Sequence, residues 1–384
     1  MTSRLRAFGT TIFSEMTALA QQHDAVNLGQ GFPDEDGPAQ VLAAAQQAIA
    51  DGHNQYAPGP GIPALREAVA EHGQRFHGLR YDPGTEVSVT FGATEGLSAS
   101  LLGICDPGDE VVVIEPSYDA YDVAIALAHA VRVPVPLVAP DFHLDLDRLR
   151  AAVSDRTRAI ILNSPHNPTG SALSADELEA IAGLCQRHDA VAVSDEVYEH
   201  LVFAGEHRSI AQVDGMRDRT VRISSAAKSF SVTGWKTGWV CAPPPLTDAV
   251  RMVKSYTTFS GGTPFQHAIA QALRLDDSYF NGLAGDYRNR RDRLVDGLRG
   301  VGFDVTEPVG TYFVAADASA LGVDDGVAFC RSLPEQAGVV AIPIGVFCED
   351  PRALASWIRF ATCKRPQVLD EGIARLAALA DRQG

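Results

Sequence analysis

Positive charge is scarce in this chain of 384 residues. Lysine and arginine together number 32 against 48 aspartates and glutamates, so the formal net charge is −16 at neutral pH. Such acidity argues against a nucleic-acid backbone or an anionic membrane surface as the main partner. Anionic small molecules are not excluded, because they respond to the local field of a site rather than to the net charge.

Long apolar runs and paired cysteines are also missing. No uninterrupted apolar stretch approaches the roughly 20 residues of a membrane span. The opening residues, MTSRLRAFG, are polar and basic and precede an amphipathic stretch, so we expect no signal peptide. The cysteines lack a CxxC pair and neighbouring histidine ligands, which predicts free thiols in a reducing compartment, no metal site and a cytoplasmic protein. They are Cys105, Cys185, Cys241, Cys330, Cys348 and Cys363.

Short apolar runs alternate with amphipathic helical patterns through the first two thirds of the chain. Unalternated strands separated by helices predict an α/β fold with a mostly parallel sheet covered on both faces. The carboxyl ends of such strands share one edge, where ligands collect. After about Gln266 longer helices and a few strands indicate a smaller α+β unit. A chain of 384 residues is longer than a single hydrophobic core usually serves, so we expect two domains. They are a large domain (45–275) and a small domain (276–384), which an N-terminal arm (1–44) joins.

The most informative segment runs from residue 224 to residue 239. It places Lys228 among serines and alanines directly after an apolar run, and Lys236 follows in a Gly/Trp-rich turn. Small neighbours let a large planar molecule approach closely. A lysine near another cation in a partly dry site has a lowered pKa and becomes a usable nucleophile. The pattern predicts a lysine that forms a Schiff base with an aldehyde cofactor, and two solvated surface lysines are the alternative.

Two loops that follow expected strands carry further candidate groups. The loop FGATEG (91–96) frees backbone N–H groups at a helix N-terminus, which makes an anion site, with a structural turn as the alternative. The loop NSPHNPTG (163–170) contains two prolines and a glycine that hold Asn167 at the strand edge. The Asn167 amide there can donate to a phenolate oxygen. We assign no role to His166.

Two charged residues are associated with apolar strands: one follows the end of a strand and the other lies inside one. Asp195 follows the strand at 191–193, where a buried carboxylate requires a cationic partner such as a pyridinium nitrogen. Glu196 is expected on a solvated turn. Arg359 lies inside the apolar run WIRFA, and its guanidinium matches a carboxylate bidentately. A structural salt bridge is the alternative for Arg359.

Seven motifs taken together resemble the class I/II aminotransferases of the pyridoxal-phosphate fold-type I group. They run from residue 27 to residue 364 in the order and approximate spacing of that family. NLGQGFPDEDGP and DEVYEHLVF look most like the branch of kynurenine, glutamine, methionine and N-succinyldiaminopimelate aminotransferases. The seven are NLGQGFPD, NQYAPGPG, FGATEG, NSPHNPTG, SDEVYEHLVF, SSAAKSFSVTGWKTGW and WIRFATCK.

The resemblance implies roles around the ring of bound pyridoxal 5′-phosphate. Lys228 would bind the cofactor aldehyde covalently and later shuttle a proton from the substrate Cα. Asp195 would pair with the pyridinium N–H, and Asn167 and Tyr198 would contact the phenolic oxygen. Tyr118 would stack on the ring face. The implied catalytic residues are therefore Lys228, Asp195 and Tyr198.

The resemblance also implies sites for the phosphate and the substrate. Tyr56 would reach the phosphate of a neighbouring subunit, which implies a homodimer with shared active sites. Arg359 would bind the substrate α-carboxylate, assisted by the Gly31 backbone and by Asn167. The remaining phosphate ligands would be the Ala93 and Thr94 backbone, the Ser225 hydroxyl and Lys236.

The function expected from this resemblance is transfer of an amino group from an L-amino acid to a 2-oxo acid such as 2-oxoglutarate or pyruvate by a ping-pong cycle. A β-lyase or an amino-acid oxidase with the same cofactor is the alternative. A non-catalytic sensor is remote, because it needs a basic DNA-binding extension that this acidic chain leaves no room for. The donor stays open, because the positions expected to shape its pocket (Phe13, Tyr56, Thr94 and Ser260) include departures from some relatives at Thr94 and Ser260.

Overall fold

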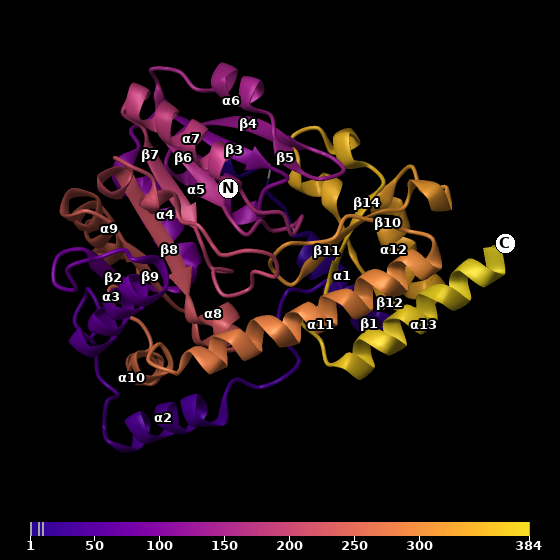
Figure 1. The fold of residues 1–384 in the computed structure, drawn as a ribbon, viewed down its shortest axis with the longest axis horizontal. Helices are drawn as coiled ribbons and strands as arrows, with labels where there is room; N and C mark the ends of the chain where they lie inside the picture. Colours follow the sequence, from indigo (N-terminus) through magenta and orange to yellow (C-terminus); the bar gives the residue numbers. More distant parts are fainter. Residues whose placement is uncertain (1, 7, 10, 384) are drawn as a thin grey trace.

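An eight-stranded sheet forms the centre of the computed structural model, which describes residues 2–6, 8, 9 and 11–383, with side chains through 379 (Figure 1). Its strand order is β2-β9-β8-β7-β6-β3-β4-β5. Neighbours from β8 through β4 are parallel, whereas β9 runs antiparallel to both of its neighbours and β5 is antiparallel to β4. The strands are β2 (Val87–Phe91), β3 (Glu110–Glu115), β4 (Val131–Val138), β5 (His143–Leu144), β6 (Thr157–Asn163), β7 (Val191–Asp195), β8 (Thr220–Ser225) and β9 (Thr237–Cys241).

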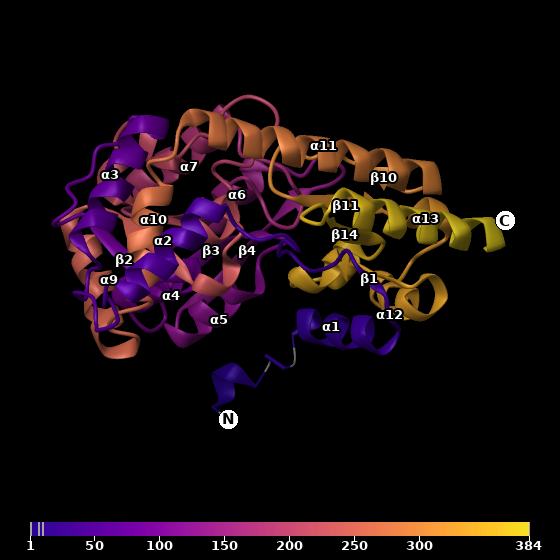
Figure 2. The same cartoon turned by 90° about the horizontal axis from the view of Figure 1, so that it is seen from below.

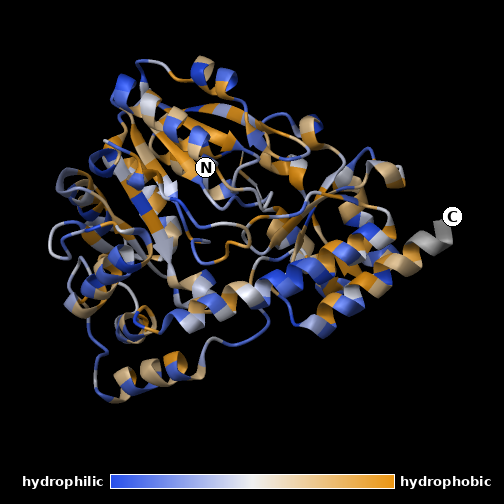
Figure 3. Ribbon diagram, viewed as in Figure 1, coloured by the Kyte–Doolittle hydropathy of each residue, from blue (hydrophilic) through white to orange (hydrophobic). Residues whose placement is uncertain are grey.

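Helices cover both faces of this sheet, as predicted. Alternate residues of β3 show the two faces: Val111 and Val113 pack in one core cluster with α4 and α5, and Val112 and Ile114 pack in another with α6 and α7. The strands are the most uniformly apolar elements of the larger part (Figure 3). The helices are α2 (Ala39–Ala50), α3 (Pro63–His77), α4 (Gly92–Ile104), α5 (Asp119–Leu127), α6 (Leu146–Ala152), α7 (Ala175–His188), α8 (Ala226–Ser229), α9 (Pro244–Thr257) and α10 (Thr263–Ala272).

The last hundred residues and the first thirty share a separate core. Met16 and Leu28 pack there with Leu294 and Phe360, and Figure 2 shows α1 beside the C-terminal part of the chain. A four-stranded antiparallel sheet, β10-β11-β14-β13, and a parallel pair, β1-β12, build this part. Its elements are α1 (Ile12–Gln22), β1 (Val26–Asn27), α11 (Asp277–Val301), β10 (Asp304–Val305), β11 (Phe313–Asp317), α12 (Gly326–Ala337), β12 (Val339–Val340), β13 (Ile342–Pro343), β14 (Trp357–Ala361) and α13 (Pro366–Gln383).

We retain as a proposal the division into an arm (1–44), a large domain (45–275) and a small domain (276–384). The separate core clusters support it. The first boundary falls inside α2, where Val41 and Ala45 both pack in the core of the larger part. Among the described residues, no helix combines the length and the apolar character that crossing a bilayer requires.

Five strands of the central sheet end or begin at one edge of it. The parallel strands β6, β7 and β8 end at Asn163, Asp195 and Ser225 on the same edge. The strand β2 also ends there, because it is antiparallel to β9, which is antiparallel to β8. The strand β9 begins at this edge, directly after Lys236. The fold therefore gathers the sequence-predicted residues of five separate segments.

A buried ionic network braces β7 and β8 close to that edge. Arg222 is 1% exposed, and its Nε lies 2.6 Å from Glu196 Oε2 while its Nη2 pairs with Glu199. The expectation that Glu196 lies on a solvated turn is therefore wrong. Burial opposes ionisation of Glu196, but Arg222 and His207 outweigh it and lower the pKa of Glu196 to about 2. Pattern alone could not reveal this partner, because Arg222 lies 26 residues away on another strand.

Candidate active site

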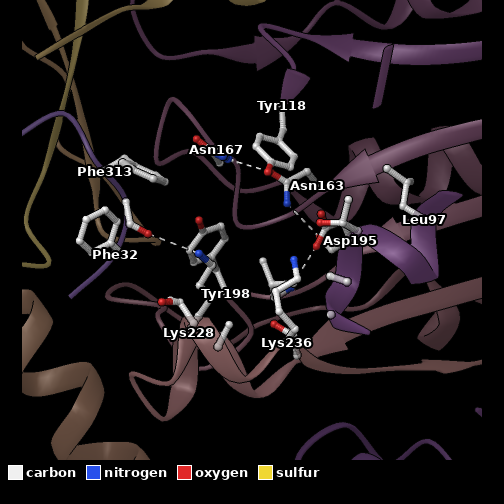
Figure 4. Close-up of a pocket in the computed structure, with 18 of the residues that line it drawn as sticks. Phe32, Leu97, Tyr118, Asn163, Asn167, Asp195, Tyr198, Lys228, Lys236 and Phe313 are labelled. Carbon is white, nitrogen blue, oxygen red and sulfur yellow. Dashed lines mark hydrogen bonds between the residues drawn. The ribbon is translucent and has the colours of Figure 1, made fainter. Parts of the chain in front are cut away.

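A cavity of about 260 Å³ lies where the strand ends of the central sheet meet the smaller part of the chain. Labelled side chains from both parts surround it in Figure 4. The structure brings together there every sequence-predicted site residue except Tyr56. Those that line the cavity are Gly31, Ala93, Thr94, Tyr118, Asn167, Asp195, Tyr198, Ser225, Lys228, Lys236 and Arg359.

Lys228 enters the cavity from the short helix α8, which directly follows β8. Its Nζ lies 3.4 Å from the Gly31 carbonyl oxygen, 5.8 Å from the ring centroid of Tyr198 and 5.3 Å from that of Tyr312. Burial lowers the pKa of Lys228 to about 8, and the nearby Arg359 acts in the same direction. The amine is therefore partly unprotonated near neutral pH, as a nucleophile or a base requires.

Asp195 is buried at the end of β7, with 8% of its surface exposed. Among the residues that the structure describes, no basic side chain lies within salt-bridge distance of its carboxylate. Burial raises the pKa of Asp195 to about 6, although a hydrogen bond from Tyr121 and one from the Val197 N–H oppose the rise. A buried carboxylate that borders a cavity without a cationic partner fits a protonated ring nitrogen.

Arg359 presents the complementary case on β14. Its Nη1 donates to Asn167 Oδ1 at 3.0 Å and its Nη2 donates to the Gly29 carbonyl at 2.7 Å, whereas its buried Nε has no partner. Its guanidinium carbon lies 4.1 Å from the ring centroid of Phe313. Within the described part of the chain no carboxylate reaches Arg359, so the structural salt bridge is not found. Burial lowers the pKa of Arg359 to about 10, and the free part of its fork suits a substrate carboxylate.

The other end of the cavity is shaped for an anion. Helix α4 starts at Gly92 immediately after β2, so the N–H groups of Ala93 and Thr94 lie in its first turn. A Cβ on Gly92 would stand 3.2 Å from Lys236 Nζ, and one on Gly238 would stand 2.6 Å from the Gly92 backbone. Glycine at position 238 therefore lets β9 approach the start of α4, and Gly92 has a positive φ of 75° that favours glycine. A phosphate group would meet both the helix N-terminus and Lys236 there.

Several cavity residues were not predicted from the sequence. Asn163 accepts a hydrogen bond from the Asn167 N–H at 2.7 Å and donates to the Asp195 carbonyl at 3.0 Å, so it fixes the position of Asn167. Tyr121 bonds to Asp195. The spacing of three residues between Tyr118 and Tyr121 on an expected helix was an available signal. Phe32 and Phe313 also line the cavity, beside Phe13, which was expected to shape the substrate pocket.

Tyr56 and His166 lie away from the chemistry of this cavity. Tyr56 is 84% exposed, and its ring meets Phe259 edge-on at 5.6 Å. This placement leaves the Tyr56 side chain at the surface of the molecule. His166 is buried, its Nδ1 lies 2.7 Å from the Thr169 hydroxyl, and burial lowers its pKa to about 4. It is a packing residue, in line with the absence of an assigned role.

One further group combines metal-ligand side chains outside the cavity. The ligand atoms of His72, Glu199 and His200 lie within 4.8 Å of one another. His72 Nε2 and His200 Nε2 already pair at 2.7 Å. Both Glu199 oxygens accept hydrogen bonds, from Arg222, His77 and Ser224. The two histidines therefore bond to each other and Glu199 is occupied by other side chains, so the group belongs to the buried network of Arg222.

Known proteins similar in sequence and structure cover almost the whole of this chain. The family model described as aminotransferase class I and II matches residues 23–376. A probable N-succinyldiaminopimelate aminotransferase of Mycobacterium tuberculosis is 54% identical over 99% of this chain and 98% of its own. The methionine aminotransferase of Escherichia coli is 41% identical over 98% of both chains. A solved N-succinyldiaminopimelate aminotransferase from Mycobacterium tuberculosis superposes with a TM-score of 0.97 at 53% identity, covering 99% of this chain and 100% of that one.

The lowered pKa of Lys228 can be tested in protein treated with hydroxylamine, which removes any aldehyde bound to the lysine amine. Competitive labelling with trace acetic anhydride, read by peptide mass spectrometry, should modify Lys228 half-maximally near pH 8, because burial and neighbouring positive charge disfavour its ammonium form. Arg359→Gln removes one of these charges and should raise that midpoint, whereas Arg352→Gln, on an exposed pair, should not. A midpoint at the ordinary lysine value of about 10.4 would contradict the prediction.

Proposed function

The chain belongs to the class I and II aminotransferases, and we propose that it works with pyridoxal 5′-phosphate held in the cavity described above. It is an enzyme that transfers amino groups, and its fold is that of the fold-type I aminotransferases, so both expectations from the motif resemblance are confirmed. The observation that carries the cofactor proposal is that one cavity presents both the half-buried amine of Lys228 and the buried carboxylate of Asp195, which has no basic side chain within salt-bridge distance among the described residues.

Bound pyridoxal phosphate supplies an aldehyde that links to amines and a protonated ring that accepts electrons from the substrate Cα. Lys228 would hold the aldehyde covalently and, once displaced, would take the proton from Cα, for which a pKa of about 8 suits it. Asp195 would keep the ring nitrogen protonated. Asn167 and Tyr198 would bind the phenolic oxygen, and Tyr118 would stack on the ring. The Ala93 and Thr94 backbone, Ser225 and Lys236 would hold the phosphate.

Arg359 binds the substrate α-carboxylate, with the Gly31 backbone and Asn167 beside it. The two half-reactions share one site, so a 2-oxo acid such as 2-oxoglutarate or pyruvate enters after the first product leaves, in a ping-pong cycle. Among the described residues, the cations of the cavity are Lys228, Lys236 and Arg359, and each has a role already. This composition favours an uncharged donor side chain, such as that of methionine, packed against phenylalanines. The ones available are Phe13, Phe32 and Phe313.

We place the working enzyme in a homodimer with shared active sites. Exposed apolar side chains gather on α9 and the adjoining loop: Met252 is 64% exposed, Tyr256 is 86% exposed and Phe259 is 45% exposed. Tyr56 contacts Phe259 and extends this surface. A second subunit covering the surface would remove it from water and bring its own Tyr56 to the phosphate of the first. The six free cysteines support a reducing compartment, and we propose the cytoplasm.

The cofactor and the reaction are tested together by absorbance and product analysis. Purified protein should be yellow and should release 2-oxo acid from a donor panel, including methionine and N-succinyldiaminopimelate, in proportion to the 2-oxo acid acceptor consumed. Lys228→Ala should lose the covalent absorbance band and slow turnover by about 10³-fold or more, since it removes the attachment point and the base. Ammonia and pyruvate in place of 2-oxo acid would indicate β-elimination. A colourless protein that takes up no added cofactor would end the proposal.

Substitution of Arg359 tests the carboxylate site. Arg359→Ala should raise the Michaelis constant for amino acids by about 10- to 100-fold, because charge-assisted hydrogen bonds of about 1.5–3 kcal/mol are lost. Cofactor content, read from absorbance, should stay intact. Arg359→Lys keeps the positive charge but loses the two-pronged guanidinium, so its Michaelis constant should fall between those of the wild type and Arg359→Ala. Loss of bound cofactor in Arg359→Ala would show a structural role instead.

Hybrid dimers test the shared site. Lys228→Ala and Tyr56→Ala subunits should each form a weakly active or inactive homodimer. A hybrid of the two contains one site that has both an intact lysine and an intact tyrosine from the partner. The isolated hybrid should therefore show about half of the wild-type activity, and an equal mixture that reassociates at random should show about a quarter. Hybrids of two Lys228→Ala subunits with different affinity tags serve as the control. No recovery in the hybrid would show that Tyr56 does not act across subunits.

A further inference from the structure

The carboxylate of Asp195 has one strong hydrogen-bond donor in this structure. The Tyr121 hydroxyl donates to Asp195 Oδ2 at 2.8 Å, and both groups are buried. The other oxygen, Oδ1, receives a longer bond from the Val197 N–H at 3.3 Å. Because a carboxylate oxygen can accept two bonds, Oδ1 retains capacity for a further donor. The mechanism above gives Tyr121 no role, although it lines the cavity.

Packing holds the Tyr121 ring in place before any ligand binds. Tyr121 is 3% exposed and sits in the first turn of α5, in the core cluster with Leu97 and Val193. Its ring meets that of Tyr118 nearly at right angles, with 5.8 Å between centroids. The backbone N–H of Tyr121 donates to the Tyr118 carbonyl at 2.9 Å. One helix start therefore supplies both the ring expected to stack on the cofactor and the hydroxyl that reaches Asp195.

Two charged side chains also act on the pKa of Asp195. The positive charge of Lys228 lowers it and the negative charge of Glu196 raises it, while Glu196 itself is paired with Arg222. A hydroxyl that donates to a carboxylate stabilises its ionised form. Burial raises the pKa of Tyr121 well above its ordinary value, so the hydroxyl keeps its proton. The other titratable groups around Asp195 are Tyr118 and Tyr198, whose pKa values burial raises.

We propose that Tyr121 is a positioning residue that keeps Asp195 ionised and aimed at the cofactor ring, and so sets the pH below which the enzyme loses its cofactor. Tyr121 touches Asp195 and acts through it. The inference rests on the proposed function, since it concerns the group that Asp195 would pair with. Without the Tyr121 proton, the Asp195 charge would depend on Lys228 and the Val197 N–H alone, and Asp195 would take up a proton at a higher pH.

Tyr121→Phe tests this by removing one oxygen from a buried ring. The dissociation constant of pyridoxal 5′-phosphate is measured by absorbance titration of the hydroxylamine-stripped protein from pH 5.5 to 8.5. The acid limb of binding should move up by about one pH unit, which weakens binding about fivefold at pH 6 relative to the wild type and little at pH 8.5. Tyr81→Phe is the matched control, because its buried hydroxyl has no hydrogen-bond partner.

The outcomes separate this inference from the proposed function. A wild type that binds no pyridoxal phosphate overturns both. A wild type that binds it, with Tyr121→Phe and Tyr81→Phe giving the same acid limb, overturns the role of Tyr121 alone. Weakening by one factor at every pH would show that Tyr121 is merely structural. In an Asp195→Asn background the group that titrates is gone, so addition of Tyr121→Phe should no longer shift the pH dependence.

Discussion

Desolvation of three ionisable side chains is the constraint on which this site depends. Asp195 and Arg359 are buried and Lys228 is half-buried, all three on one cavity, and the loss of contact with water shifts each pKa so that the neutral form is favoured. An uncompensated buried charge is costly unless a partner completes it. A cation bound beside Asp195 and a carboxylate bound beside Arg359 would therefore each stabilise the site. The same dryness makes Lys228 a better nucleophile and base, so binding and chemistry come from one physical cause.

The architecture explains how such groups are held without collapsing onto one another. Asp195 and Lys228 come from β7 and the end of β8, whereas Arg359 comes from β14 in the separate sheet of the smaller part. Rigid strands set the spacing, and the buried pairs of Arg222 with Glu196 and Glu199 brace β7 against β8. Truncating Arg222 would take the arginine partner from two buried carboxylates and leave them with histidines and hydroxyl groups alone, so this network ties the stability of the sheet to the geometry of its edge.

Much of the fold and most of the site could be predicted from the sequence, for identifiable reasons. Strands such as β7 and β14 are short apolar runs, and Lys228, Asp195 and Asn167 stand in motifs whose order is specific. The strand β4 was missed, since its two prolines are unfavourable for a strand. Tyr121 escaped notice because its partner is 74 residues away. Glu196 was misplaced for the same reason: a long-range ion pair leaves no local pattern.

Substrate choice is the property least visible in one chain. Recognition of the α-carboxylate and of the ring needs charged or polar groups at fixed points, which motifs record. In our proposal the donor side chain would meet the phenylalanines that line the cavity and, in the dimer, residues of a second subunit near Tyr56 and Phe259. Apolar walls discriminate weakly, since one methylene changes binding by only about 1–3 kcal/mol. A relative that is 54% identical can therefore share every polar contact of the site and still act on a different amino acid. We therefore expect the shape of the pocket, rather than any single residue of the motifs, to set the specificity of this chain.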